Sequence, residues 1–203
     1  MIPFEEKMSR GGGAAIEEAS RFLMKQGPVW ESLERIAAKL EELKIPYAVA
    51  GGLALVAHGY NRTTVDVDVL VTPQGLKALH VALEGLGYVP PFAGSKQLRD
   101  VATSVRIEFL VSGQFPGDGK PKPVAFPDPS DVAVEIEGVK YVGLVPLVEL
   151  KLASGISHPG RAKDIGDVQE LIRVLQLPRE FGSKLNEYVR GKFYELHEGA
   201  QRE

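Results

Sequence analysis

The sequence predicts an α+β protein in which helices flank a mixed β-sheet, with a helical arm before the sheet and a helical part after it. Three observations predict this class. Apolar residues recur at helical spacing over residues 29–44, short valine-rich segments fill the middle of the chain, and helical patterns return near residue 146. We therefore divide the chain into an N-terminal leader with helices (1–45), a core (46–145) and a C-terminal helical part (146–203).

Composition narrows the classes of function. The chain has 203 residues, 44% of them hydrophobic and 25% charged, with no cysteine and a formal net charge of −3. Disulfides, thiolate zinc sites and thiol catalysis are therefore excluded. The net charge does not favour bulk binding to nucleic acid. Because the sequence has neither a membrane-length apolar run nor a signal-peptide core, we expect no membrane association and a cytoplasmic location.

The N-terminal arm is expected to contain two helices. Residues 1–13 end in three glycines and predict a flexible leader, and residues 14–26 predict a short helix. Gly27 and Pro28 interrupt that helix. The amphipathic pattern of residues 29–44 then predicts a longer one, which ends before Pro46.

The core alternates strands and helices before it becomes rich in strands. Its first half predicts a strand at 47–50, a glycine turn and a helix at 53–59, a strand at 65–71, and a helix that is capped by Thr72 and runs to about residue 87. Its second half predicts strands at 88–89 and 104–111, an irregular loop at 112–130 and a hairpin of 131–136 with 139–142. Three C-terminal helices are expected, over 146–157, over 162–176 and after Pro178.

The strand at 65–71 contains the most informative residues. Asp66 and Asp68 are two apart, so both side chains point to one face of the strand, while flanking valines fill the other. Two adjacent carboxylates repel each other, and burying them without a partner is costly. A divalent cation removes this conflict, and Mg²⁺ (or Mn²⁺) prefers carboxylate and phosphate oxygens. The pattern therefore predicts a metal site.

Two neighbouring features extend this hypothesis. The Gly51-Gly52 turn, with a helix directly behind it, predicts backbone N–H groups that approach a phosphate. Glu108 lies on a later strand and could complete a three-carboxylate site for two metals, or act as a general base. Arg106 has the same parity as Glu108, so both could face one cleft.

A resemblance to a known family rests on these residues. Gly51-Gly52, thirteen residues and then Asp66-Val67-Asp68 on an apolar strand resemble the motif of the polymerase-β-like nucleotidyltransferase superfamily. The run from Arg62 to Asp68 resembles abortive-infection-type toxin nucleotidyltransferases, as do Leu147-Val148-Glu149-Leu150-Lys151 and the later segment from Arg161 to Asp167. The resemblance covers roughly residues 46–175.

The resemblance implies a nucleotidyltransferase-like mixed sheet, a nucleoside triphosphate donor, Mg²⁺ and transfer of a nucleotidyl group to an acceptor hydroxyl. The site residues it implies, with those inferred above, fall into three groups. They are catalytic and metal-binding Asp66, Asp68 and Glu108; nucleotide-binding Gly51, Gly52, Lys151 and Arg62; and acceptor or phosphate contacts Arg106, Arg161 and Lys163. This chain departs from the family at Gly52, where many members have Ser, and at Glu108, where Asp is commoner.

Simpler interpretations stay open for most of these residues. Asp-x-Asp is often a solvated edge, Glu108 an exposed strand residue, and Arg106 one half of a cross-strand ion pair. Lys151 could be a surface lysine, and Arg161 and Lys163 a solvated helix start. Asp164 and Asp167 are expected as helix-start carboxylates favoured by the dipole, which could pair with Arg161 or Lys163. The loop at 112–130 is either a lid or an irregular crossing.

Two hypotheses for function follow. The first is a Mg²⁺-dependent nucleotidyltransferase that acts on RNA, protein or a small molecule, as an enzyme alone or as the toxin of a toxin–antitoxin pair. The second is a nucleotide-binding or protein-interaction module that has lost its chemistry on the same scaffold. A homodimer and an antitoxin are the partner proteins considered. The sequence names neither the donor base nor the acceptor.

Overall fold

The computed structural model describes residues 2–200. Its helices are α1 (Phe4–Ser9), α2 (Gly13–Leu23), α3 (Pro28–Glu42), α4 (Gly51–Ala57), α5 (Pro73–Leu83), α6 (Pro129–Val132), α7 (Leu144–Ser157), α8 (Ala162–Val174) and α9 (Glu187–Ala200), with short 3₁₀ turns at Pro159–Arg161 and Arg179–Lys184. Its strands are β1 (Tyr47–Val49), β2 (Asp66–Val71), β3 (Tyr88–Val89), β4 (Gln97–Asp100), β5 (Arg106–Val111), β6 (Ala133–Ile136) and β7 (Val139–Val142). The α+β class predicted from the sequence is confirmed.

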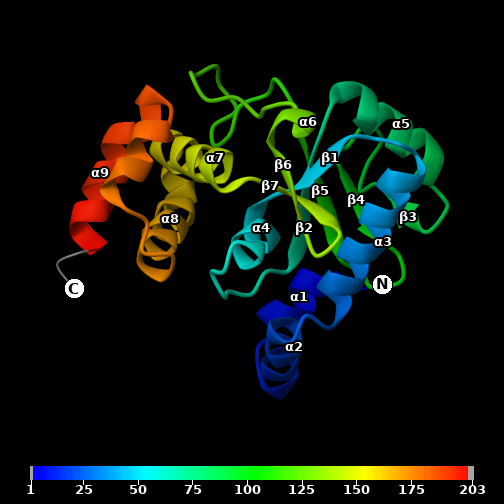
Figure 1. Cartoon of the computed structure of the whole chain (residues 1–203). Coiled ribbons are helices and arrows are strands. Elements are labelled where there is room, and N and C mark those ends of the chain that lie inside the picture. The colour runs from blue at the N-terminus through cyan, green and yellow to red at the C-terminus, as the bar shows by residue number, and fades with distance from the viewer. Residues whose placement is uncertain (1, 201–203) are drawn as a thin grey trace.

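One mixed sheet organises the molecule (Figure 1). Its strand order is β3-β4-β5-β2-β1-β7-β6. Strand β2 runs parallel to β5 and antiparallel to β1, and β1 runs parallel to β7. Strands β2 and β5 therefore bring residues that are 40 positions apart in the sequence to the same level of the sheet.

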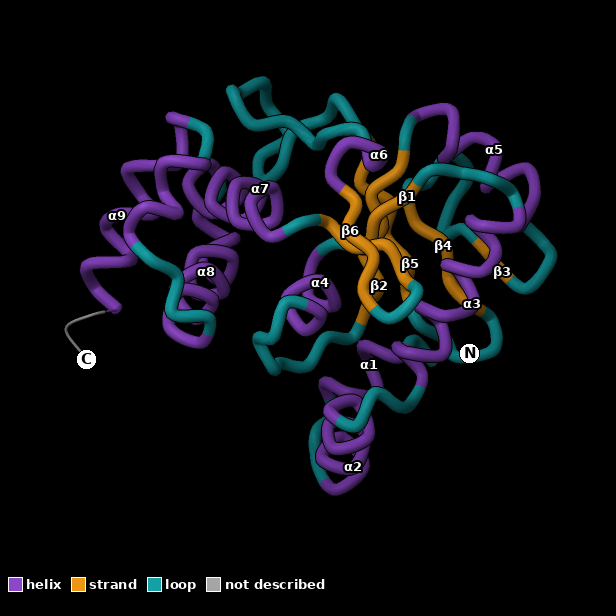
Figure 2. The backbone as a smooth tube through the Cα atoms, in the orientation of Figure 1, coloured by secondary structure: helices purple, strands orange, loops and turns teal. Residues whose placement is uncertain are grey.

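Helices surround this sheet unevenly. Figure 2 shows α3 and α5 beside the strands, whereas α7, α8 and α9 form a separate group next to the β7 end. Helix α3 buries one stripe, in which Leu33, Ile36 and Leu40 are almost fully inaccessible, because these residues recur every three or four positions. Thr72 caps α5 by accepting a hydrogen bond from the Gly75 N–H, as predicted. Within residues 2–200, no helix combines the length and apolar character needed to cross a membrane.

Three local expectations were wrong. Residues 4–9 of the expected leader form a helix, because Phe4 is buried and its N–H bonds to the Ser104 carbonyl. Residues 129–132 of the expected loop and hairpin form a helical turn that Asp128 caps. Strand β4 was not expected, because its sequence, Gln-Leu-Arg-Asp, is mostly polar and lacks a strand pattern.

Candidate functional site

Two parallel strands place the predicted acidic residues side by side. In the register of β2 and β5, Asp66 is opposite Arg106 and Asp68 is opposite Glu108. All four residues line one cavity, while Val67 and Ile107 between them are fully buried on the opposite face. The alternation of both strands therefore produces a charged floor on one side and core on the other.

The glycine turn lies directly against one of these carboxylates. Gly51 has φ +58°, and a Cβ atom at this position would lie 1.8 Å from Asp68 Oδ2. A Cβ atom on Gly52 would lie 2.8 Å from the Thr64 side chain. Both positions therefore require glycine, the first because of its left-handed backbone and both because of close approach. The turn fixes where the Asp68 carboxylate can lie.

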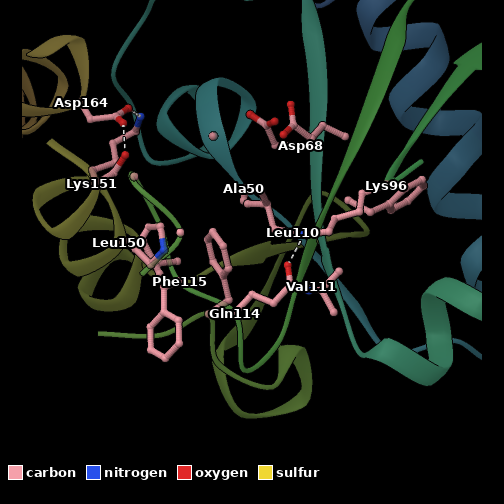
Figure 3. Close-up of a pocket in the computed structure, with 18 of the residues that line it drawn as sticks. Ala50, Asp68, Lys96, Leu110, Val111, Gln114, Phe115, Leu150, Lys151 and Asp164 are labelled. Carbon is pink, nitrogen blue, oxygen red and sulfur yellow. Dashed lines mark hydrogen bonds and ion pairs between the residues drawn. The ribbon is translucent and has the colours of Figure 1, made fainter. Parts of the chain in front are cut away.

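The cavity has a volume of about 590 Å³, within the range of small-ligand sites. Its floor is the charged face of β2 and β5, and its other walls come from α7, from the start of α8 and from the loop after β5. Figure 3 shows Asp68 on the sheet side and the Lys151–Asp164 pair on the helical side, with Phe115 and Gln114 of the loop below both groups in this view. Phe115, Phe126 and Leu150 add apolar surface on which a ring could stack.

Asp66 is already held by protein donors. Its Oδ2 accepts a hydrogen bond of 2.5 Å from Arg106 Nη2, and its Oδ1 accepts one of 2.8 Å from the Thr64 hydroxyl. The ion pair is partly shielded, with 33% of the Arg106 side chain and 19% of the Asp66 side chain exposed. Thus Arg106 does form a cross-strand ion pair, one of the two interpretations left open by the sequence, and it does so inside the cavity.

Asp68 is in a less favourable environment. The pKa of Asp68 is raised to about 7, chiefly by burial and then by the negative charges of Asp66 and Glu108, which Lys151 and Arg106 offset only in part. The ionised carboxylate therefore has too little compensating positive charge around it. This imbalance is what a bound cation would correct.

The donor set fits a hard divalent cation. Asp66 and Asp68 supply oxygen ligands from adjacent positions of one strand, and Glu108 lies next to Asp68 on the same floor. Within residues 2–200, however, no three histidine or carboxylate side chains are arranged to hold a metal ion as they stand. Metal binding by Asp66, Asp68 and Glu108 therefore stays a prediction.

The helical wall contains a buried network of charges. Lys151 Nζ lies 2.9 Å from Asp164 Oδ1 and 2.7 Å from Asp167 Oδ2. Arg62 makes a two-pronged contact with Asp167, at 2.8 and 2.9 Å, and Arg161 reaches Asp164 at 2.8 Å. The network joins α7 to α8 and to the segment before β2.

This network extends one interpretation and corrects another. Asp164 pairs with Arg161, as one interpretation allowed, but Asp164 and Asp167 are also buried and both bind Lys151 of the preceding helix. Burial alone would raise the pKa of Asp164, but Lys151, Ser154 and Arg161 outweigh that effect and hold it below its usual value. Lys151 is also buried and is not a surface lysine, although it still lines the cavity.

The loop between β5 and α6 closes one side of the cavity. It is ordered by Lys122, whose Nζ donates to the Pro116 carbonyl at 2.6 Å and to the Ser157 hydroxyl of α7 at 3.2 Å. Lys96, which directly precedes β4, donates a hydrogen bond to the Gln114 side chain of the same loop. The loop is therefore attached to both the sheet and the helical wall, as a cover of the site should be.

The structure brings together most of the residues singled out from the sequence. The cavity is lined by Gly51, Asp66, Asp68, Arg106, Glu108, Lys151 and Arg161. Three others lie outside its lining: Gly52 packs on Thr64, Arg62 is paired with Asp167, and Lys163 is exposed.

Three further residues at the site were not singled out from the sequence. Thr64 is the one that a signal could have revealed, because it precedes Asp66 by two positions and so shares its face. Lys96 and Phe115 belong to segments with no regular pattern, and only the folded chain brings them to the cavity.

Comparison with known proteins supports the fold. No family model matches the sequence, and no curated protein matches it. A crystal structure of ANT(2'')-Ia in complex with adenylyl-2''-tobramycin aligns with a TM-score of 0.53 at 15% identity, over 81% of this chain and 96% of that chain. A solution structure of the antibiotic-resistance factor ANT(2'')-Ia aligns with a TM-score of 0.52 at 15% identity, over 84% and 95%. The chain has a polymerase-β-like nucleotidyltransferase fold.

Proposed function

We propose that the protein is a Mg²⁺-dependent nucleotidyltransferase, which moves a nucleoside monophosphate from a nucleoside triphosphate to an acceptor hydroxyl. The acceptor oxygen would form a bond to the α-phosphorus, the bond between the α-phosphorus and the oxygen of the β-phosphate would break, and pyrophosphate would leave. One observation supports this most directly. The carboxylates of Asp66, Asp68 and Glu108 lie in register on two parallel strands, at the floor of a cavity of about 590 Å³ and against the Gly51 turn.

Each part of the cavity has a role in this proposal. Asp66 and Asp68 would hold the metal, which when bound neutralises the triphosphate and makes the acceptor hydroxyl more acidic. Glu108 lies beside Asp68 and would accept the proton of the attacking hydroxyl. Gly51, at the start of α4, lines the cavity against Asp68, and the backbone N–H groups of this turn would be the contacts for the phosphates. Phe115 offers a surface for a base or for the acceptor.

Most of the rate acceleration would come from positioning and from charge stabilisation. Lys151 contributes indirectly, because its ammonium is bound by Asp164 and Asp167 and so fixes the helical wall of the cavity. Arg62 adds a second cation to Asp167 and links that wall to the strand that carries Asp66. We assign Lys163 no role in binding, because it is exposed outside the cavity.

The acceptor is the open part of this proposal. One structural neighbour, ANT(2'')-Ia, was solved with adenylyl-2''-tobramycin, so hydroxylated aminoglycosides are a reasonable first class of small acceptor. RNA and protein acceptors are the other two classes. The toxin role in a toxin–antitoxin pair is a biological setting for the enzyme and does not depend on the class of acceptor.

The test is transfer of label from each α-³²P nucleoside triphosphate in the presence of Mg²⁺. RNA, the protein itself and aminoglycosides serve as acceptors, and each reaction is run with wild type, Asp68→Asn and Asp131→Asn. The last variant is the control, because Asp131 is an exposed aspartate outside the cavity. Incorporation by wild type and the control, but not by Asp68→Asn, is the expected result.

A second function has one observation in its favour. Asp66 is already neutralised by Arg106, which is what a chain without catalysis would retain to stabilise its carboxylates. If the protein binds nucleotides tightly but incorporates no label into any acceptor class, it is a nucleotide-binding or protein-interaction module on this fold.

A further inference from the structure

Two arginines lie opposite each other on β4 and β5, and one of them, Arg106, lines the cavity. In the register of β4 and β5, Arg99 is directly across from Arg106. Like charges at such positions repel, so each needs its own anion. Arg99 has a two-pronged contact with Glu5 of α1, at 2.8 and 3.0 Å, and it also donates to the Ser104 carbonyl at 2.6 Å. Arg106 takes Asp66 instead.

The Arg106 contact uses an atom that a metal would need. Asp66 Oδ2 accepts from Arg106, and Asp66 Oδ1 accepts from Thr64, so neither oxygen is without a protein donor. A free divalent cation must therefore weaken a short, charge-assisted hydrogen bond before it can bind Asp66 well. Removal of Asp66 from its pair would also leave the Arg106 guanidinium, beside Arg99, without its hydrogen-bonded carboxylate, and only Glu108 and Glu5 would remain as nearby negative charges.

Arg106 has donors available for a second anion. A guanidinium carries five N–H donors, and the Nε of Arg106 is buried without a hydrogen-bond partner among the described residues. The side chain lines the cavity in which the triphosphate would lie. Phosphate oxygens arriving with the metal would give this guanidinium the anion that it loses when the metal takes Asp66.

We propose that Arg106 is a positioning residue that serves as the counterion of Asp66 in the metal-free protein. The free metal ion therefore binds weakly, and the metal–triphosphate complex binds strongly. This inference rests on the proposed function, because it concerns the same carboxylates. It assigns Arg106 opposite effects on two ligands. Arg106 competes with the free metal ion, and it contributes to binding of the metal–triphosphate complex.

Because Arg106 should have opposite effects on these two ligands, the proposal can be tested by binding measurements alone, without an activity assay. The experiment is a calorimetric titration of the full chain with Mn²⁺ alone, and separately with preformed Mn²⁺–tripolyphosphate, which avoids any choice of base. Arg106→Gln should bind Mn²⁺ alone at least tenfold more tightly than wild type, and the complex at least tenfold more weakly. Arg106→Lys, which keeps the charge, should remain close to wild type for both ligands.

Arg99→Gln is the matched control. It removes the neighbouring arginine on the adjacent strand, whose partner is Glu5 and not a carboxylate of the cavity floor. It should leave both affinities within about threefold of wild type. Melting temperatures of all variants, measured without metal, identify any variant that does not fold, and Arg106→Lys then provides the comparison with wild type.

The outcomes separate this inference from the proposed function. If wild type binds Mn²⁺–tripolyphosphate but Arg106→Gln changes both affinities in the same direction, or leaves that for Mn²⁺ alone unchanged, the role of Arg106 is refuted and the metal site stands. If wild type binds neither ligand, the metal site fails and the role of Arg106 fails with it.

Discussion

Replacement of Asp68 by asparagine should stabilise the metal-free protein. The pKa of Asp68 is raised to about 7 from an ordinary 3.8, chiefly by burial and then by the charges of Asp66 and Glu108. A difference of this size corresponds to about 4 kcal/mol between the two protonation states, which is the upper limit for the destabilisation caused by the ionised group. Because the asparagine amide loses the charge but stays in the cleft, we expect a gain of about 2 kcal/mol at pH 8.

The stability gain of Asp68→Asn over wild type should increase as the pH rises. Between pH values near 3.8 and 7, the folded wild type holds a proton on Asp68 that the unfolded chain has lost. The wild type therefore loses stability as pH rises through this window, and the loss levels off above it. Asp68→Asn lacks this titration, so its advantage over wild type should be small near pH 4 and complete near pH 8.

Urea denaturation in EDTA at pH 4.5, 6 and 8 measures this advantage, with exposed Asp131→Asn as the control. Saturating Mg²⁺ with triphosphate should reduce or reverse the stability advantage of Asp68→Asn over wild type, because a ligand that binds only the folded wild type stabilises it. If Asp68→Asn is less stable than wild type at pH 8 in EDTA, or if its advantage does not change with pH, the claim that ionised Asp68 destabilises the metal-free protein is refuted.

Three further outcomes are expected from the same structure. Gly51→Ala should lower the free energy of unfolding by at least about 1 kcal/mol and abolish binding of Mn²⁺–tripolyphosphate. Gly85→Ala, at φ +79° with no atom within 4 Å of its Cβ, should cause only the backbone strain and leave that binding intact. Lys151→Met should cost about 3–5 kcal/mol in urea denaturation, because two buried aspartates lose their shared cation. Lys122→Met should speed amide hydrogen exchange in the loop after β5 with little effect on global unfolding. Unchanged exchange in this loop would contradict the claim that Lys122 holds it against α7.

The charged floor could be predicted from the sequence because its signal is local. Asp66 and Asp68 alternate with fully buried valines, and the Gly51 turn precedes them at a spacing that the fold requires. Strand alternation fixes the face of each side chain whatever the rest of the chain does. Glu108 followed by the same reasoning on β5, and the register of β2 with β5 brings it next to Asp68.

The features that sequence reasoning missed depend on distant partners. Helix α1 forms because Phe4 is buried and Glu5 pairs with Arg99, a residue 94 positions away. Asp164 was expected as a helix-start carboxylate, yet it is buried and forms hydrogen bonds with Lys151 and Ser154 of the preceding helix. Local propensity favours exposure for charged residues, and only tertiary pairing overrides that preference.

The central claim is that the cavity is a metal-dependent nucleotide site built on Asp66 and Asp68. The most direct measurement is calorimetric titration with each of the four nucleoside triphosphates plus Mg²⁺, on wild type and on the double variant Asp66→Ala/Asp68→Ala. The account predicts binding of at least one triphosphate by wild type, and its loss both in EDTA and in the double variant. Binding that persists in EDTA or in the double variant, or no binding of any triphosphate by wild type, would contradict it.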